Sequence, residues 1–388
     1  MKEWTTYKLK DICIKITDGS HFSPTAREDG YPMFSVKDME EYGFNYASCK
    51  RISLEDFNTL KANDCVPQKG DILVAKDGSF LKQIFVCNET KEEAILSSIA
   101  IFRPNPEYVL PEFLCYILKS PKVYNYISQN CVSGSALPRI VLKAFKEVEV
   151  SIPSIAIQKW IISKLIPIDQ KIQLNRQIND NLEQQAQALY KSWFVNFEPF
   201  KDQEFVESEF GLIPEGWQCT TLSELLCIKY GKDHKKLAEG TIPVYGSGGL
   251  MRYVDTKLHE GEAVLIPRKG TLNNVMYVNE AFWTVDTMFY SIPKQENSCI
   301  YAYLFLANKD LASMNAGSAV PSMTTDILNN MLIIAPPAEV LRQFNNICNV
   351  YFSRINQNNI ENANLSNQRD TLLPKLMSGE LKINEIDC

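Results

Sequence analysis

The chain has 388 residues, of which 45% are hydrophobic and 22% charged, and its formal net charge is −6. This length predicts about two to four domains, and the composition excludes a disordered chain. The acidic balance excludes a uniformly basic nucleic-acid-binding protein, so any contact with nucleic acid has to come from local basic patches or from a partner. No apolar stretch approaches the length of a membrane span and no secretory signal begins the chain, so we expect a cytoplasmic protein without a membrane segment.

The eleven cysteines predict neither disulfides nor a metal site. Their number is odd, and the closest pair, Cys219 and Cys227, is too far apart for a C-x-x-C motif, so we expect reduced, mostly buried thiols. The three histidines lack partners at ligand spacing. The sequence also lacks the loops typical of nucleotide binding or amino-methyl transfer, so we expect no catalytic residue, cofactor or metal in this chain.

Residues 1–153 mix strand-like and helical segments, which predicts an α+β domain. Residues 108–120 predict an amphipathic helix, and Asp71 at a strand start is typical of a structural turn rather than of acid–base chemistry. Two Asp-Gly pairs predict turns, at 18–19 and 77–78. Four apolar runs predict strands: residues 72–75, 84–87, 98–102 and 148–152.

Residues 154–200 predict one long helix and a connector. Apolar side chains recur every three or four positions over about forty residues, apart from one seven-residue step that skips Ala186, which makes a helix of about 60 Å. Pro167 lies inside this pattern, so we expect it to kink or break the helix. One small domain does not cover a helix of this length, which favours a long partner helix over packing on a single domain.

Residues 201–335 predict a linker and a second α+β domain. Within it, residues 300–310 predict a helix that matches the helix of the first domain. Residues 336–388 predict a second long helix, with Pro374 near its end, and a C-terminal tail. The middle of this second helix is rich in asparagine, which is typical of a two-helix seam rather than of a globular core.

The two halves of the chain are related as a repeat. The motif GSALP recurs as GSAVP 183 residues later, and the same offset superposes the two helical segments. Upstream, the run KGDILVAKDG at 69–78 resembles EGEAVLIPRKG at 260–270, with loops of different length between. The matching pairs include Gly134 with Gly317, Pro153 with Pro336, and Trp4 with Trp217.

Several motifs in a fixed order make the whole chain resemble the specificity (S) subunit of type I restriction–modification systems: DGSHFSP at 18–24, GSALP, GLIPEGW at 211–217, GSAVP and TLLPKLMSGEL at 371–381. The resemblance implies two target recognition domains, similar to those of some DNA adenine methyltransferases, that bind double-stranded DNA. It also implies antiparallel helices that dock two modification (methyltransferase) subunits, which bind S-adenosylmethionine. A restriction (motor-nuclease) subunit would complete the complex. Family helices are usually unbroken, so Pro167 is a departure.

Each predicted domain precedes its own helix. This order predicts that the helices pair antiparallel as a coiled coil, in an internal pseudo-twofold repeat. Two similar but non-identical readers suit a bipartite, asymmetric DNA target. We expect four apolar residues to be buried in the helix seam: Ile172, Leu182, Ile355 and Leu365.

Candidate DNA-binding residues lie in the polar loops of both domains. Arginine pairs with guanine edges and asparagine with adenine edges, while lysines suit phosphates. A solvated lysine loop and an ordinary loop histidine are the structural alternatives. The first domain offers Ser20, His21, Lys76, Lys82 and Arg139. The second offers Lys232, His234, Lys235, Lys236, Arg268, Lys269, Asn273 and Asn274.

Two other functions stay open at this point. A repeat adaptor would hold two proteins through its helices while its degenerate domains no longer read DNA. An enzyme, either a self-sufficient methyltransferase or a nuclease, is disfavoured by the missing cofactor motifs. Binding to random and selected duplexes with a methyltransferase partner separates the reader from the adaptor.

Overall fold

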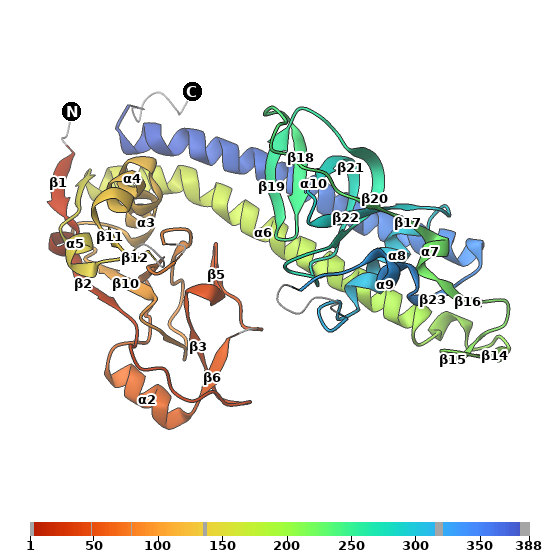
Figure 1. Ribbon diagram of the computed structural model, residues 1–388. Helices are drawn as coiled ribbons and strands as arrows, with labels where there is room; N and C mark the ends of the chain where they lie inside the picture. The colour runs from red at the N-terminus through yellow and green to blue at the C-terminus, as the bar shows by residue number, and fades with distance from the viewer. Residues whose placement is uncertain (1–3, 48, 79, 135–137, 315–320, 381–388) are drawn as a thin grey trace. The chain divides into compact units, whose positions relative to one another are not determined.

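The structure is a computed structural model that describes residues 4–47, 49–78, 80–134, 138–314 and 321–380 (Figure 1). None of the helices within these ranges combines the length and the apolar character that a bilayer crossing requires. The central residues of the motifs GSALP and GSAVP lie outside the described ranges.

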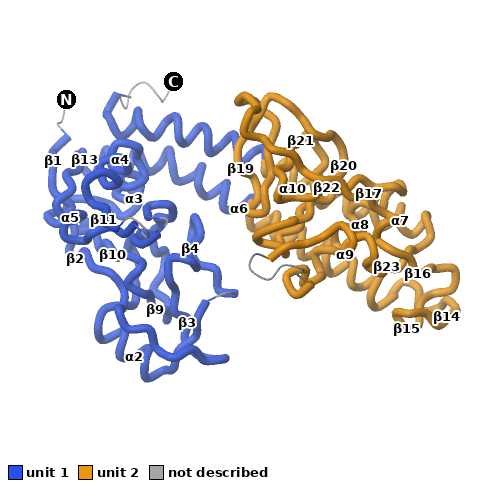
Figure 2. The backbone as a smooth tube through the Cα atoms, viewed as in Figure 1, with its two compact units in different colours: residues 1–175, 360–388 blue, residues 176–359 orange. Residues whose placement is uncertain are grey.

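Two compact units make up the chain (Figure 2). Unit 1 comprises residues 1–175 and 360–388, and unit 2 comprises residues 176–359. Each unit is α+β, as predicted, and contains part of the two longest helices, α6 (Ile155–Phe194) and α10 (Ala338–Met377). Both helices have 40 residues and start 183 residues apart, which confirms the repeat. The predicted domain boundaries stay predictions, because the compact units share both helices.

Unit 1 is built on a four-stranded antiparallel sheet. Its shorter elements in chain order are β1 (Thr5–Lys8), α1 (Leu9–Ile12), β2 (Cys13–Asp18), β3 (Tyr31–Phe34), η1 (Val36–Asp38), β4 (Met39–Glu40), β5 (Gly43–Phe44), β6 (Lys50–Ile52), α2 (Leu54–Ala62), β7 (Ile72–Ala75), β8 (Ile84–Val86), β9 (Ala94–Ile95), β10 (Ile99–Pro104), α3 (Pro111–Lys119), α4 (Pro121–Asn130), β11 (Val132–Ser133), β12 (Arg139–Ile140), α5 (Leu142–Lys146) and β13 (Glu149–Ile152). The main sheet has the order β2-β10-β7-β8. A second sheet has the order β6-β3-β9, in which β3 and β9 are parallel. The strands β7, β8, β10 and β13 and the helix α3 confirm the elements predicted for the first domain.

The core of unit 1 forms because its sheet and its covering helix are apolar. All four residues of β7 are fully buried, from Ile72 to Ala75. Helix α3 buries six consecutive side chains, from Phe113 to Leu118, and its first residue, Pro111, has the backbone angle that a first helical turn needs. Burial of this apolar surface is the main favourable term for the unit.

Unit 2 is built on a six-stranded sheet of order β17-β22-β20-β21-β18-β19. Within it, β18 runs parallel to β21, as β3 does to β9 in unit 1. The shorter elements in chain order are η2 (Glu198–Phe200), β14 (Phe205–Ser208), β15 (Gly211–Pro214), β16 (Gln218–Thr221), α7 (Leu222–Leu225), β17 (Leu226–Tyr230), β18 (Ile242–Gly246), β19 (Gly249–Val254), β20 (His259–Pro267), β21 (Met276–Thr284), β22 (Met288–Pro293), α8 (Cys299–Ala307), α9 (Thr325–Asn329) and β23 (Leu332–Ala335).

The two units share one order of elements. The sequence β1–α1–β2 of unit 1 recurs as β16–α7–β17 in unit 2, and α5–β13 recurs as α9–β23. In both units the first of these strands pairs antiparallel with the last, so that Thr5 lies opposite Ile152 and Gln218 lies opposite Ala335. The repeat found in the sequence is therefore a repeat of strand pairing as well.

Each unit core contains one end of each long helix. In unit 1, Leu165 near the start of α6 belongs to the same buried cluster as Leu376 near the end of α10. In unit 2, the ring centroids of Phe194, at the end of α6, and Phe344, near the start of α10, lie 4.7 Å apart. Because opposite ends of the two helices meet in each unit, the helices pair antiparallel, as predicted.

Helix α6 runs without interruption through Pro167, so the predicted break is wrong, and the alternative, a kink at this position, stays a prediction. Proline costs about 3 kcal/mol or more inside a helix. Fully buried side chains on both sides, Leu165 before it and Ile172 after it, hold the helix against this cost. Proline 374 lies in the last turn of α10, near the helix end as predicted.

The apolar seam between the helices is narrower than predicted. Ile172 is fully buried, but the other three predicted seam residues, Leu182, Ile355 and Leu365, are only half-buried. A pair of helices leaves both edges of its seam open, so only a narrow stripe of each helix is removed from water.

Asparagines fill the middle of the seam. Asn175 is fully buried, and its Nδ2 donates to Oε2 of Glu361 at 2.8 Å and to Oδ1 of Asn362 at 2.9 Å. In unit 2, Nδ2 of the buried Asn358 donates to Oδ1 of Asn179 at 2.7 Å. These bonds satisfy the side-chain N–H groups of Asn175 and Asn358, whose burial without an acceptor would be costly, and they match residues of one helix to residues of the other.

A polar cluster attaches the body of unit 1 to its helices. Asp169 of α6 accepts hydrogen bonds from the hydroxyls of Tyr42 and Tyr116, at 3.1 and 2.5 Å, and from Nη1 of Arg369 of α10 at 2.8 Å. Burial raises the pKa of both tyrosines, so both remain donors. The repeat position in unit 2 holds Phe352, whose ring packs 4.9 Å from a tyrosine ring of β21.

We expect Ile172→Ala to lower the free energy of unfolding by about 2–5 kcal/mol, because it removes a fully buried side chain and leaves a cavity. Leu182→Ala on the same helix is the matched control and should cost about 1 kcal/mol, since this leucine is half-buried. Urea titration followed by circular dichroism measures both. Equal losses would contradict the narrow seam.

Candidate nucleic-acid interface

Four of the five candidate residues of unit 1 gather where β2 and β7 end: Ser20, His21, Lys76 and Arg139. The backbone N–H of Gly19 donates to the carbonyl oxygen of Ile99 at 3.1 Å, and that of Lys76 donates to the carbonyl oxygen of Ser98 at 2.9 Å. A Cβ at Gly19 would lie 2.3 Å from the carbonyl oxygen of Ile95, so this close approach requires glycine. The chain segments that follow the two strands are thereby held against the loop before β10.

Lys76 is a buried cation between two carboxylates. Its side chain is 7% exposed, and its Nζ lies 2.7 Å from Oδ2 of Asp18 and 3.9 Å from Oδ1 of Asp77. The same Asp18 oxygen lies 3.5 Å from Nε2 of the exposed His21, and Oδ1 of Asp77 lies 3.7 Å from Nε of Arg139. These five side chains form a continuous group, the unit 1 charge cluster.

Sequence reasoning missed the two carboxylates of this cluster. Both Asp18 and Asp77 belong to the Asp-Gly pairs that predicted turns, and this was the signal that could have found them. Ser20 is buried next to the cluster, and its hydroxyl donates to the carbonyl oxygen of Phe22 at 2.8 Å, which is a structural contact. Lys82 is exposed in the connection between β7 and β8 and does not take part in the cluster's ion pairs.

Unit 2 builds the same backbone arrangement. The N–H of Gly231 donates to the carbonyl oxygen of Met288 at 3.0 Å, and the N–H of Arg268 donates to that of Thr287 at 2.8 Å. A Cβ at Gly231 would lie 2.0 Å from the carbonyl oxygen of Val285. The glycine and the arginine therefore occupy the positions that a glycine and a lysine occupy in unit 1.

Further backbone contacts support this equivalence. Asp77 forms an isolated antiparallel bridge with Arg139, and Lys269 forms one with Ser322. Unit 2 therefore has Ser322 at the position of Arg139, and Lys269 at the position of Asp77. In both units the next glycine donates its N–H to a proline carbonyl oxygen: Gly78 to Pro138 at 2.8 Å and Gly270 to Pro321 at 3.4 Å.

The equivalent positions carry different side-chain chemistry. In unit 2, the guanidinium carbon of Arg268 lies 5.3 Å from the centroid of the Tyr230 ring, and its Nη1 donates to the carbonyl oxygen of Asp286 at 3.2 Å. Tyr230 ends β17 as Asp18 ends β2. The arginine of unit 2 is partly exposed and stacked on an aromatic ring, whereas the lysine of unit 1 is buried between carboxylates.

The basic run of unit 2 follows Gly231 on a loop held by its backbone. The carboxylate of Asp233 accepts the N–H of Lys235 at 3.1 Å, which lowers the pKa of Asp233. Nη2 of Arg252 donates to the carbonyl oxygen of the half-buried His234 at 2.8 Å. The lysines of this run are exposed: Lys232, Lys235 and Lys236.

The two predicted asparagines of unit 2 are engaged in contacts within the protein. Nδ2 of Asn273 donates to Oδ1 of Asp310 at 3.0 Å, and its Oδ1 accepts the N–H of Ala312 at 2.8 Å. Nδ2 of Asn274 donates to the carbonyl oxygen of Ser247 at 2.9 Å. Pairing with adenine would use the same side-chain amide groups, so the hydrogen bonds within the protein compete with a base contact. A base contact by either asparagine stays a prediction.

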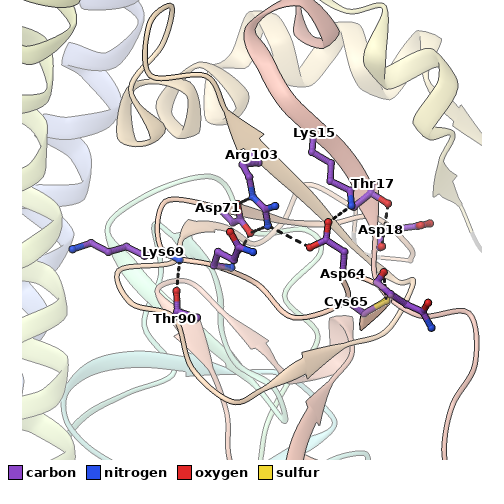
Figure 3. Close-up of polar contacts among 11 residues, drawn as sticks. Lys15, Thr17, Asp18, Asp64, Cys65, Lys69, Asp71, Thr90 and Arg103 are labelled. Carbon is purple, nitrogen blue, oxygen red and sulfur yellow. Dashed lines mark hydrogen bonds and ion pairs between the residues drawn. The ribbon is translucent and has the colours of Figure 1, made fainter. Parts of the chain in front are cut away.

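A second group of charges in unit 1 supports the sheet (Figure 3). Arg103 of β10 donates two hydrogen bonds to Asp71, at 2.8 and 2.9 Å, which raise the pKa of Arg103. The fully buried Asp71 also accepts the N–H of Gln68 at 2.8 Å, and Lys15 pairs with Asp64 beside this group. These contacts close the turn before β7, in agreement with the structural role predicted for Asp71.

The described residues show no group of three or more histidine, cysteine, aspartate or glutamate side chains arranged to hold a metal ion. Every cysteine within them is a free thiol, and six of these are buried, as predicted. Burial raises the pKa of Cys13, Cys87 and Cys348 to about 12, so these thiols are protonated at neutral pH. The side chains at the ends of the strands in the two units include cations, carboxylates and hydrogen-bond donors.

We expect Gly231→Ala to lower the free energy of unfolding by about 1–3 kcal/mol, because its methyl group would collide with backbone carbonyl oxygens. These oxygens belong to the main chain, so they cannot rotate out of the way as a flexible side chain can. Gly248→Ala, in the turn between β18 and β19, is the control: its methyl group meets open space, and the change should stay within about 0.5 kcal/mol. Thermal unfolding compares the two. A harmless Gly231→Ala would show that the close approach is not required.

Comparison with known proteins identifies the family. Residues 1–184 and 214–367 match the family model described as type I restriction modification DNA specificity domain. The chain is 25% identical over 417 residues to the Type I restriction enzyme MjaIX specificity subunit of Methanocaldococcus jannaschii, covering 99% of this chain and 95% of that protein. It is 26% identical over 476 residues to the Type I restriction enzyme HindI specificity subunit of Haemophilus influenzae, covering 98% and 100%.

The fold is similar to a crystal structure of a type I restriction–modification S subunit from M. genitalium. The TM-score is 0.54 at 19% sequence identity, and the match covers 96% of each chain. The family model, in two segments, accounts for most of the sequence and follows the repeat described above. This chain therefore belongs to the family of type I restriction–modification specificity subunits.

Proposed function

We propose that this chain is the DNA sequence-recognition and scaffold subunit of a type I restriction–modification complex. Unit 1 and unit 2 each read one half of a bipartite, asymmetric target in double-stranded DNA. The paired helices dock two modification (methyltransferase) subunits, and a restriction (motor-nuclease) subunit joins them. The relatives named as specificity subunits of type I restriction enzymes support this proposal.

One observation carries the proposal: the two units present different side chains on the same backbone arrangement. Lys76 of unit 1 pairs with Asp18, and Arg268 of unit 2 stacks on Tyr230. Base pairs differ in the donors and acceptors that they present, so two domains that read different half-sites from one shared backbone arrangement need different side chains on it. An adaptor that only joins proteins does not need different base-contacting side chains in its two units.

Affinity and discrimination come from different side chains in this proposal. The exposed lysines of the basic run suit phosphates, whose contacts are independent of sequence. Arg268 suits a guanine edge, because stacking on Tyr230 and a bond to the carbonyl of Asp286 limit its orientations. With a net charge of −6, the chain relies on its partners for the rest of the DNA clamp.

The chemical steps belong to the partners. S-adenosylmethionine binds to the modification subunits, and this chain contributes no catalytic residue. The second candidate function, a repeat adaptor, shares the docking of partners through α6 and α10 but lacks sequence preference. The two functions therefore differ in one measurable property, the dependence of DNA binding on sequence.

Coexpression of this chain with its modification subunits should methylate one bipartite, asymmetric sequence, because each unit reads its own half. Exchange of residues 211–334 for those of a relative should change one half of the target and leave the other intact. Sequencing of methylated bases across the host genome measures both outcomes. The purified chain alone is the control and should transfer no methyl group. Methylation without sequence preference would favour the adaptor, and a change in both halves would exclude independent readers.

Lysines and the arginine of unit 2 should respond differently to substitution. The double variant Lys235→Ala with Lys236→Ala should weaken binding of the partner-bound complex evenly across sequences and flatten the salt dependence by about 0.9 for each lost phosphate contact. Arg268→Ala should lose about 1–3 kcal/mol of discrimination at one or two base pairs of one half-site. Binding to a panel of single-base variants at two salt concentrations measures both. An unchanged profile for Arg268→Ala would remove this residue from the reading surface.

A further inference from the structure

We propose that Arg139 is a specificity-determining residue of unit 1 and that Asp77 is its positioning residue. This inference rests on the proposed DNA-reading function. It names the side chain of unit 1 that contacts the bases. It follows from a difference between the two units at one shared backbone position.

The backbone position that exposes an arginine in unit 2 carries a buried lysine in unit 1. Lys76 replaces Arg268 there, but its side chain is only 7% exposed, and its Nζ lies 2.7 Å from Asp18 and 3.9 Å from Asp77. A lysine buried between two carboxylates is held by both charges. If its ammonium group moved away to contact DNA, it would leave two buried carboxylates without their partner. Lys76 is therefore a structural cation, and the base-reading group of unit 1 has to come from another element.

Arg139, which begins β12, is an exposed member of the same cluster, as is His21, and it is the one that carries a guanidinium. Its side chain is 58% exposed, and its Nε lies 3.7 Å from Oδ1 of Asp77, whose side chain is 15% exposed. The backbones of the two residues form a bridge, which sets the distance between them. The closest approach, between Nε and Oδ1 at 3.7 Å, is longer than a hydrogen bond, so this ion pair leaves the N–H donors of the guanidinium available for the fork that binds O6 and N7 of guanine.

Asp77 is built to hold this arginine more tightly when DNA is present. Among the described residues, its buried Oδ1 accepts no hydrogen bond. A movement of Arg139 by about 1 Å would convert the 3.7 Å ion pair into a hydrogen bond. Binding to DNA would then give the buried Oδ1 of Asp77 a hydrogen-bond donor and remove the free-energy cost of leaving it without one. This gain favours one orientation of the Arg139 guanidinium.

Unit 2 has no counterpart of this pair. Its repeat positions hold Lys269 in place of Asp77 and Ser322 in place of Arg139. The two units thus present an arginine from different segments of one framework: from β12 in unit 1 and from the end of β20 in unit 2. Readers that differ in this way recognise different half-sites even though their backbones match.

The test uses the partner-bound complex and panels of single-base variants in both half-sites, at two salt concentrations. Arg139→Ala should reduce discrimination about 5- to 150-fold at one or two base pairs of the half-site read by unit 1 and leave the other half-site unchanged. Arg139→Lys should keep the salt dependence but lose the same discrimination, because lysine lacks the fork. Lys143→Ala, which removes an exposed charge from the neighbouring α5, is the control and should change affinity evenly or not at all.

Asp77→Asn separates positioning from a purely structural role. It should reduce discrimination at the same base pairs as Arg139→Ala, with the profile of the other half-site unchanged. If it weakens binding to all sequences and both half-sites alike, Asp77 is structural and the positioning role is overturned. If Arg139→Ala keeps the wild-type profile while exchange of unit 1 still changes its half-site, only this inference fails. A wild-type complex without sequence preference would instead overturn the proposed function.

Discussion

The structure depends on the antiparallel pairing of α6 and α10, because each helix contributes one end to the core of each unit. Unit 1 is completed by Leu376 of the last helix, and unit 2 contains both Phe194 from the end of α6 and Phe344 from the start of α10. The contact between Asp169 and Arg369 joins residues 200 positions apart, so its formation requires closure of a long loop. Completion of unit 1 is therefore linked to helix pairing.

The seam that permits this pairing is polar at its middle. A continuous apolar stripe would tolerate sliding of one helix along the other, whereas buried amides lose their partners if the register changes. Asn175 with Glu361 and Asn362, and Asn358 with Asn179, supply such partners on both sides of the midpoint. The half-burial of Leu182 and Leu365 follows from the same geometry, since a pair of helices leaves both edges of its seam open.

The backbone arrangement at the ends of the strands is the same in both units, but it carries different side chains in each. Gly19 and Gly231 allow the chain to approach a neighbouring carbonyl so closely that no side chain fits, and this fixes where the next residues emerge. The side chains at the edge of this arrangement are then free to differ. Unit 1 uses carboxylates to bury Lys76 and hold Arg139, and unit 2 uses Tyr230 to carry Arg268.

The sequence by itself determined the repeat, the two 40-residue helices, the main strands and the loops that carry the cations, because periodicity, turn residues and internal similarity are local properties of the chain. Only the tertiary structure decided which side chains those residues contact and which of them are buried. Lys76 and Arg268 are both cations that follow a strand, yet Asp18, 58 positions from Lys76, buries one of them, and an aromatic ring supports the other. Pro167 follows the same principle: the local rule predicts a kink or a break, and the helix stays unbroken because Leu165 and Ile172 beside the proline are buried by segments far away in the chain. Burial and charge pairing depend on residues far apart in the chain, so no local pattern contains them.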